Sequence, residues 1–169
     1  MSSEYLMKPI GVISSPFKDV SEHVPIQGAL KPDAEGVIKI YPDYAEGLRD
    51  LDGFSHVILV YVFHRCHGSL LTVRPYMDTE KRGVFSTRSP HRPNHIGITV
   101  VKIASIDGNT IHVTGIDMLD GTPLLDIKPY IPSFDSAAGA TIGWAEKYLS
   151  SGETPVSTST KSEEEWRHA

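Results

Sequence analysis

The fold class is decided by residues 98–116, which read ITVVKIASIDGNTIHVTGI. Residues 98–106 and 110–116 are rich in β-branched side chains, and Asp107-Gly108-Asn109 separates the two runs. β-branched side chains favour extended backbone, and a short turn of Asp, Gly and Asn between two such runs is typical of a hairpin. The stretch therefore predicts two consecutive antiparallel strands.

Further strands are predicted at residues 7–13, 37–41 and 56–63, from apolar runs or from alternation of apolar and polar residues. Short helices are predicted at 44–51, with Asp43 as the N-cap, and at 141–149. Short strands separated by turn clusters favour a mainly β protein, either a small barrel or a sandwich. A doubly wound parallel sheet is disfavoured, because no glycine-rich turn follows the first strand and no long helices separate the strands.

The chain has 169 residues, one cysteine and a formal net charge of −5 at pH 7. This length fits one domain, predicted to span residues 1–149. Residues 150–169 are rich in Ser, Thr and Glu and predict a disordered polar tail. With no signal peptide, no long apolar span and no possible intrachain disulfide, we expect a cytoplasmic protein with no membrane partner.

The negative net charge is distributed unevenly along the chain. Between His64 and Lys102, the only acidic residues are Asp78 and Glu80, whereas the basic residues are Arg65, Arg74, Lys81, Arg82, Arg88, Arg92 and Lys102. A phosphate backbone responds to the local charge of a surface more than to the total charge. The middle third of the chain is therefore a candidate for contact with a nucleic acid.

Residues 82–97, RGVFSTRSPHRPNHIG, form the most unusual segment. Pro90 and Pro93 restrict the backbone without secondary structure, so the pattern predicts a stiff loop that holds Arg88 and Arg92 in place. The planar guanidinium suits phosphate and carboxylate groups. His91 and Asn94, on the same loop, are further candidates for contact with a substrate.

Residues 117–130, DMLDGTPLLDIKPY, are the second unusual segment. Asp120-Gly121 predicts a turn, and Thr122-Pro123 predicts an extended exit into a short strand with Asp126 and Lys128 at its rim. Carboxylates beside such a turn can accept hydrogen bonds from hydroxyl or amino groups of a ligand. A turn in which Asp120 only caps its own backbone is the structural alternative.

These two segments, with GFSHVILVYVFH at 53–64 and IGVISSPF at 10–17, resemble the TsaA-like (TrmO) family over most of residues 7–135. The resemblance implies a small β-barrel that works as a homodimer and lacks a metal ion. It also implies an S-adenosylmethionine-dependent methyltransferase that methylates N6 of threonylcarbamoyladenosine at position 37 of tRNA. The chain would be a short form without the additional C-terminal domain of many members.

The resemblance also implies a cofactor-binding set, which comprises Pro25, Ile26, Gln27, His64, Arg65, Arg88, Ile98, Asp117, Met118, Leu119 and Asp120. Two positions depart from the family pattern. Ile26 stands where an arginine is expected, and His95 stands where a proline follows the asparagine.

Methyl transfer from a sulfonium needs aligned reactants more than a strong base, although a nearby acceptor would help to remove the N6 proton. We predict Asp126 and Tyr130 as candidates for that acceptor. Lys128 or Arg92 would neutralise the threonyl carboxylate or a phosphate.

Two interpretations from other classes remain open. One is a nucleotide- or RNA-binding module that keeps the fold without turnover. The other is a metal-dependent hydrolase, suggested by His56, His64 and His67 around Cys66, although their spacing matches no familiar zinc pattern. A lone Cys66 is more typical of a small apolar filler than of a nucleophile.

Overall fold

The computed structural model describes residues 4–20, 24–76 and 78–149. The strands are β1 Gly11–Ser14, β2 Glu35–Ile40, β3 His56–Val62, β4 Thr72–Val73, β5 Arg82–Gly83, β6 Ile96–Asp107, β7 Thr110–Thr114 and β8 Thr122–Pro129. The 3-10 helices are η1 Gly28–Leu30, η2 Pro42–Leu48, η3 Leu51–Gly53, η4 Val84–Ser86 and η5 Gly143–Ala145. The α-helices are α1 Pro132–Asp135 and α2 Glu146–Leu149.

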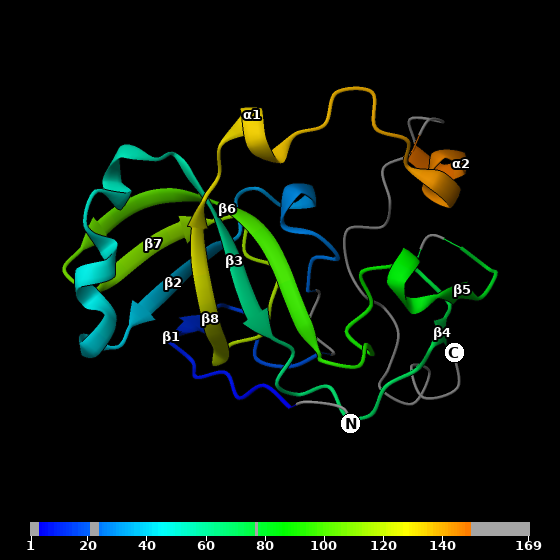
Figure 1. The fold of residues 1–169 in the computed structure, drawn as a ribbon, viewed down its shortest axis with the longest axis horizontal. Helices are drawn as coiled ribbons and strands as arrows, with labels where there is room; N and C mark the ends of the chain where they lie inside the picture. Colours follow the sequence, from blue (N-terminus) through cyan, green and yellow to red (C-terminus); the bar gives the residue numbers. More distant parts are fainter. Residues whose placement is uncertain (1–3, 21–23, 77, 150–169) are drawn as a thin grey trace.

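Six antiparallel strands close into a barrel in the order β1-β2-β7-β6-β3-β8, which confirms the mainly β, single-barrel prediction (Figure 1). Alternation explains the core, since every second residue of β3 points inward and Val57, Leu59 and Tyr61 are buried. Ile111 and Leu124 fill the same interior from β7 and β8. β6 is long enough to pair with β3 along its first half and with β7 along its second.

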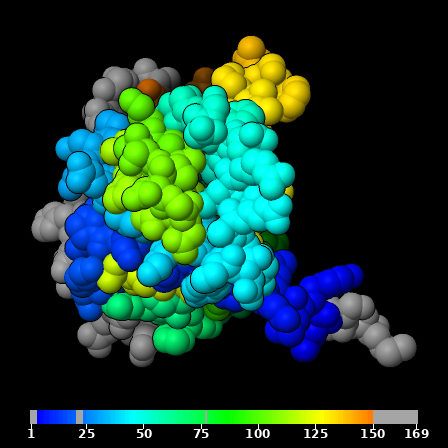
Figure 2. Space-filling view, turned by 90° about the vertical axis from the view of Figure 1, so that its left-hand side faces the viewer, coloured from blue at the N-terminus to red at the C-terminus, as the bar shows by residue number. Residues whose placement is uncertain are grey.

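The predicted hairpin between 98–106 and 110–116 is confirmed as β6 and β7. Gly108 has φ 57° at the first position of the two-residue turn, a conformation that glycine adopts without steric strain. At the tip, Asn109 Nδ2 donates to the Ile40 carbonyl over 2.6 Å. Figure 2 shows η2 and η3 (cyan) beside this hairpin (green).

Three predicted elements differ at their boundaries. The first strand begins at Gly11 rather than at residue 7, because Pro9 has no N–H to donate to a neighbouring strand. The helix predicted at 44–51 is instead the 3-10 helix η2, whose N-cap position is Tyr41 and not Asp43. Asp50 at φ 65° separates η2 from η3.

The helix predicted at 141–149 begins only at residue 143. There it makes one 3-10 turn, η5, and one α turn, α2. Gly143 has φ 56°, which is incompatible with a right-handed helix that continues from residues 141 and 142.

A small unit lies beside the barrel, formed by β4, β5, η4, η5 and α2 (Figure 1). Val73 and Val84 are each 1% exposed and are buried apart from the main core cluster. The predicted tail at 150–169 lies outside the described residues. Within the described residues, no helix is both long and apolar enough to cross a membrane.

Candidate functional site

The carboxylate of Asp117 lies buried at one end of the barrel and receives three hydrogen bonds. Its donors are Thr99 Oγ1 at 2.6 Å, the Gly28 N–H at 2.8 Å and the Tyr61 hydroxyl at 3.5 Å. Burial raises the pKa of Asp117 to about 6, against the lowering effect of these donors. Burial also raises the pKa of Tyr61 above its ordinary value. Asp117 therefore connects three protein groups. Its carboxylate oxygens already accept hydrogen bonds within the protein, which leaves little capacity to bind a ligand.

The segment with Pro25, Ile26 and Gln27 is docked on this carboxylate through Gly28. A Cβ on Gly28 would lie 1.9 Å from the Gly115 carbonyl oxygen, so only glycine allows this close approach. Arg88 donates a hydrogen bond to Gln27 Oε1, which connects the proline-rich loop, residues 82–97, to the 25–28 segment. Two predicted cofactor-binding residues that are 61 positions apart thus meet.

The turn at 117–120 is bound to the chain that follows β1. Asp120 accepts hydrogen bonds from Lys18 Nζ at 2.8 Å and from the Ser15 N–H at 3.0 Å, and Ser15 Oγ donates to the Met118 carbonyl. The Lys18 ammonium, aided by the Ser15 N–H, lowers the pKa of Asp120. Asp120 therefore remains an anion at neutral pH, 31% exposed in its side chain.

His64 and Arg65 reach the same turn from the end of β3. Arg65 Nη1 donates to the Lys18 carbonyl at 2.7 Å. His64 Nδ1 lies 3.4 Å from Thr122 Oγ1, which donates to the Leu119 carbonyl. Burial and the nearby Arg65 lower the pKa of His64, so its neutral form is favoured.

Ile98 lies apart from this cluster. Its side chain is 53% exposed on the outer face of β6, opposite Val60 in the register, whereas the neighbouring Thr99 points inward to Asp117. The predicted cofactor-binding set is thus brought together except for Ile98.

The residues predicted for catalysis also lie away from the cluster. Asp126 and Lys128 pair with Val60 and Ile58 on the outer face of the barrel and form an ion pair of 2.7 Å with each other. Tyr130 stacks edge-on against His56, at 6.4 Å between ring centroids. A bulge at Val60/Tyr61 changes the register of β8, and the strand alternation then turns these side chains outward. Within one chain, the structure does not bring the predicted acceptor and the cofactor-binding set together.

The loop residues predicted to bind substrate have different surroundings. Arg92 Nη1 donates to the Thr87 carbonyl at 3.1 Å, so Arg92 braces its own loop. His91 Nδ1 lies 3.3 Å from Cys66 Sγ, and burial raises the pKa of that thiol to about 11. Asn94 is exposed just before β6. The high thiol pKa favours the filler interpretation of Cys66 over a nucleophile.

Metal ligands do not converge in the part of the chain that the structure describes. No group of three His, Cys, Asp or Glu side chains there could hold an ion. The metal-dependent hydrolase interpretation therefore gains no support from these residues.

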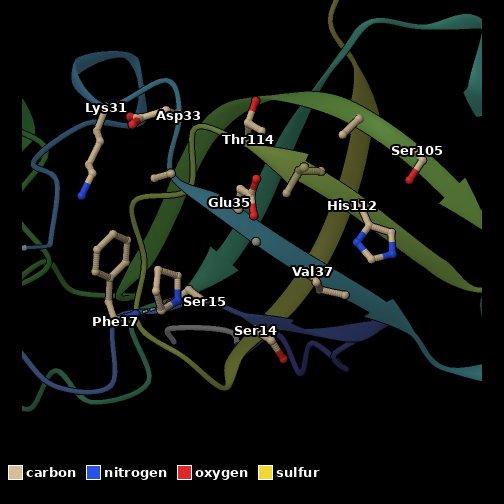
Figure 3. Close-up of a pocket in the computed structure, with 15 residues that line it drawn as sticks. Ser14, Ser15, Phe17, Lys31, Asp33, Glu35, Val37, Ser105, His112 and Thr114 are labelled. Atoms are coloured by element: carbon tan, nitrogen blue, oxygen red, sulfur yellow. Dashed lines mark hydrogen bonds between the residues drawn. The ribbon is translucent and has the colours of Figure 1, made fainter.

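A hollow on the outer face of β1, β2 and β7 has a volume of about 840 Å³ (Figure 3). Lys31, Glu35 and His112 line it, together with Ser15 and Phe17, which also border the 117–120 turn. None of the predicted site residues lines this hollow.

Sequence reasoning missed the inner partners of the site, which are Ser15, Lys18, Gly28, Tyr61 and Thr99. Strand alternation could have identified Tyr61 and Thr99 as inward-facing polar groups that need a partner. No local pattern identifies Gly28 or Lys18 as partners of an aspartate about a hundred residues away.

Comparison with known proteins places the chain in a family. The model of the tRNA-methyltransferase O N-terminal domain matches residues 12–136. A probable S-adenosyl-L-methionine-binding protein of Pyrococcus abyssi is 52% identical over 140 residues, which cover 83% of this chain and 76% of the relative. The tRNA (adenine(37)-N6)-methyltransferase of Mus musculus is 39% identical over 81% of this chain, but the match spans only 33% of that enzyme.

Among solved structures, TrmO from Pseudomonas aeruginosa superposes with a TM-score of 0.71 at 38% sequence identity. The superposition covers 85% of this chain and 63% of the Pseudomonas chain. The chain thus spans less than two thirds of that solved structure. By sequence and by fold, the chain belongs to the family of the tRNA-methyltransferase O N-terminal domain.

Proposed function

We propose that this protein transfers a methyl group from S-adenosylmethionine to N6 of threonylcarbamoyladenosine at position 37 of tRNA. The observation that carries the proposal is the convergence of the Gln27–Arg88 pair, the His64-Arg65 pair and the 117–120 turn at one end of the barrel. These segments are far apart in the sequence, and the family resemblance assigns all of them to the cofactor.

Relatives support the coarser part of the proposal, which is S-adenosylmethionine-dependent methyl transfer to tRNA. Their names describe proteins that bind S-adenosylmethionine and enzymes that methylate adenine 37 of tRNA. The threonylcarbamoyl group as the recognised feature is the finer part, and it rests on the resemblance of the loop at 82–97 and of the turn at 117–120. Because the proposed substrate is tRNA, we place the protein in the cytoplasm.

The charged groups of the cluster fit the cofactor chemically. Asp120 is a partly exposed anion suited to an ammonium or a hydroxyl group, and Arg88 is an exposed cation suited to a carboxylate. When bound, S-adenosylmethionine supplies an electrophilic methyl group. The residues of this chain would hold the two reactants in line, which is the main requirement of such a displacement.

The position of the predicted proton acceptor leads us to infer a homodimer. Asp126 and Tyr130 share the outer face of β3, β6 and β8 with the exposed side chains of Ile98 and Val100. An apolar strip with charged neighbours is typical of an interface. If a second copy covers this face, Ile98, Asp126 and Tyr130 lie between the two subunits instead of facing solvent.

Incubation of the protein with labelled S-adenosylmethionine tests the proposal, using tRNA with threonylcarbamoyladenosine and the matching unmodified transcript. We expect label only in the modified tRNA, because a site built to pair the added polar groups rejects a substrate that lacks them. Asp120→Ala should abolish most of the labelling, and Lys8→Ala, an exposed residue outside the predicted cofactor-binding set, serves as the control.

Three outcomes would contradict the proposal in different ways. Efficient labelling of the unmodified transcript would remove the threonylcarbamoyl specificity but keep the methyltransferase. Binding of both ligands without transfer would indicate a non-catalytic module. Hydrolysis that depends on an added metal and stops with a chelator would indicate the hydrolase.

A further inference from the structure

The carboxylate of Asp78 is fully enclosed, with a side-chain exposure of 0%, and is held by groups from two distant segments. Arg82 contacts it through Nε at 2.8 Å and Nη2 at 2.7 Å, and the Glu80 N–H donates at 3.1 Å. The fourth donor is the hydroxyl of Tyr148, at 2.8 Å and 70 residues further along the chain. These bonds, led by that from Glu80, hold the pKa of Asp78 well below its usual range.

Trp144 makes a second contact between the same two segments. Its indole Nε1 donates to the Ser86 carbonyl at 2.8 Å, and the guanidinium of Arg82 lies over its ring at 5.9 Å from the centroid. Trp144 and Tyr148 are themselves edge-to-face neighbours, at 6.5 Å between ring centroids. We call residues 143–149 the C-terminal clamp.

The contacts of Trp144 and Tyr148 connect the clamp to the base of the proline-rich loop. Ser86 precedes Arg88 by two residues, and Arg88 contacts the 25–28 segment through Gln27. Figure 1 shows α2 next to β5 and reached by a long connection from α1. The family match ends at residue 136, so the clamp lies beyond the matched domain.

We propose that Trp144 and Tyr148 are positioning residues for the loop at 87–95, which carries Arg88, predicted to bind the cofactor, and the residues predicted to contact the substrate tRNA. They act through Asp78, Arg82 and Ser86, and neither contacts the predicted cofactor-binding set in a described hydrogen bond. The proposal rests on the proposed function for its substrate, but not for the contact between clamp and loop.

The physical basis is the free energy of ordering a loop. Residues 87–95 contain neither helix nor strand, and hydrogen bonds such as that from Arg92 Nη1 to the Thr87 carbonyl hold the loop internally. The placement of the whole loop therefore depends on how its base is anchored. Fixing its base lowers the conformational entropy that tRNA binding must remove. Removal of the Tyr148 hydroxyl would leave one Asp78 oxygen with fewer donors in an enclosed place, which weakens the clamp without deleting any charge.

Tyr148→Phe tests the proposal, with Tyr44→Phe, an exposed tyrosine of η2, as the matched control. Two quantities are measured under native conditions: the rate of tryptic cleavage after Arg82 and Arg88, and the KM for tRNA together with kcat. The bond between Arg92 and Pro93 resists trypsin, so cleavage in the loop reports on Arg88. Cleavage after Lys39 and Lys102 in the barrel reports global unfolding.

We expect Tyr148→Phe to accelerate cleavage after Arg88 and to raise the KM for tRNA about fivefold. Trp144→Phe, which removes the N–H to Ser86 and reduces the aromatic surface under Arg82, should act in the same direction. Unchanged cleavage and KM in both variants would overturn the proposal, as would an equal rise of cleavage in the barrel. If the wild-type protein methylates no tRNA, the proposed function fails, and the cleavage rates still decide the role of the clamp.

Discussion

At the scale of single residues, the role of Asp117 in the structure differs from the role that the sequence predicts. The turn pattern predicts that Asp117 accepts hydrogen bonds from a ligand. In the structure its carboxylate instead accepts them from Gly28, Thr99 and Tyr61. Its neighbour Asp120 remains exposed enough to meet a ligand. Of the two aspartates at the ends of the turn, we therefore expect Asp117 to act through the position of Gly28 and Asp120 to act directly.

The raised pKa of Asp117 predicts a pH-dependent contribution to stability. The folded pKa of about 6 exceeds the ordinary value of 3.8, so the folded state holds the proton more tightly. The contribution is fully present below pH 3.8 and is lost as the pH rises through 6, with a maximum of about 3 kcal/mol. Urea unfolding of wild type and Asp117→Asn at pH 5 and pH 7.5 measures it.

We expect the stability of the wild type relative to Asp117→Asn to be smaller at pH 7.5 than at pH 5. The pKa values of Asp78, Asp120 and His64 are lowered, so these groups change the stability with pH in the opposite direction. Because wild type and variant share them, their contributions cancel in the difference between the two proteins. The same difference at both pH values would show that Asp117 titrates normally.

At the scale of elements, the 25–28 segment and the proline-rich loop act as connected parts. Gly28→Ala should displace the segment, because the new Cβ would meet the Gly115 carbonyl oxygen at 1.9 Å. The loss of the bond from the Gly28 N–H to Asp117 should cost about 1–3 kcal/mol of stability and weaken S-adenosylmethionine binding by about tenfold or more. Calorimetry and thermal unfolding check both values.

Gly47→Ala in η2 is the matched control for that prediction, since nothing lies within 4 Å of its added Cβ. It should leave cofactor affinity unchanged and keep or raise the stability. Equal effects of the two substitutions would refute the specific role of Gly28.

Substitutions of Arg92 distinguish two roles for its side chain, which are bracing of the loop and attraction of a phosphate group. Arg92→Lys keeps the charge but cannot reproduce the planar donor that holds the Thr87 carbonyl. If Arg92 mainly braces the loop, Arg92→Lys and Arg92→Ala should weaken tRNA binding to the same extent, with the salt dependence nearly unchanged. Filter binding at several salt concentrations tests this, and full rescue by lysine would assign the residue to a phosphate contact.

At the scale of the whole molecule, the outer face of β3, β6 and β8 predicts self-association. Ile98→Asp should dissociate the proposed homodimer, because it would bury a carboxylate within an apolar strip. Sedimentation of the variant should give the mass of one chain and that of wild type the mass of two. His112→Asp on the outer face of β7 is the control, and a monomeric wild type would rule the homodimer out.

Local sequence was sufficient for much of the fold. β-branched runs and the Asp107-Gly108-Asn109 turn predicted β3, β6 and β7 almost to the residue, because side-chain alternation and turn chemistry act over a few positions. The family resemblance likewise predicted that Gln27, Arg88 and the 117–120 turn belong to one cofactor-binding set. Local signals were weaker near Pro9, Asp50 and Gly143, where backbone restrictions override the pattern of side chains.

What the sequence by itself determined was the six strands of the barrel, the main turns and the family. Only the tertiary structure decided that Gly28 binds Asp117 across 89 residues, that Tyr148 binds Asp78 across 70, and that Asp126 faces outward after the bulge at Val60/Tyr61. The reason is physical: barrel closure and strand register are set by the packing of the whole core, and they select which distant polar groups meet. A residue's type fixes what chemistry it can perform, and its partners in the closed barrel fix which part of that chemistry it performs.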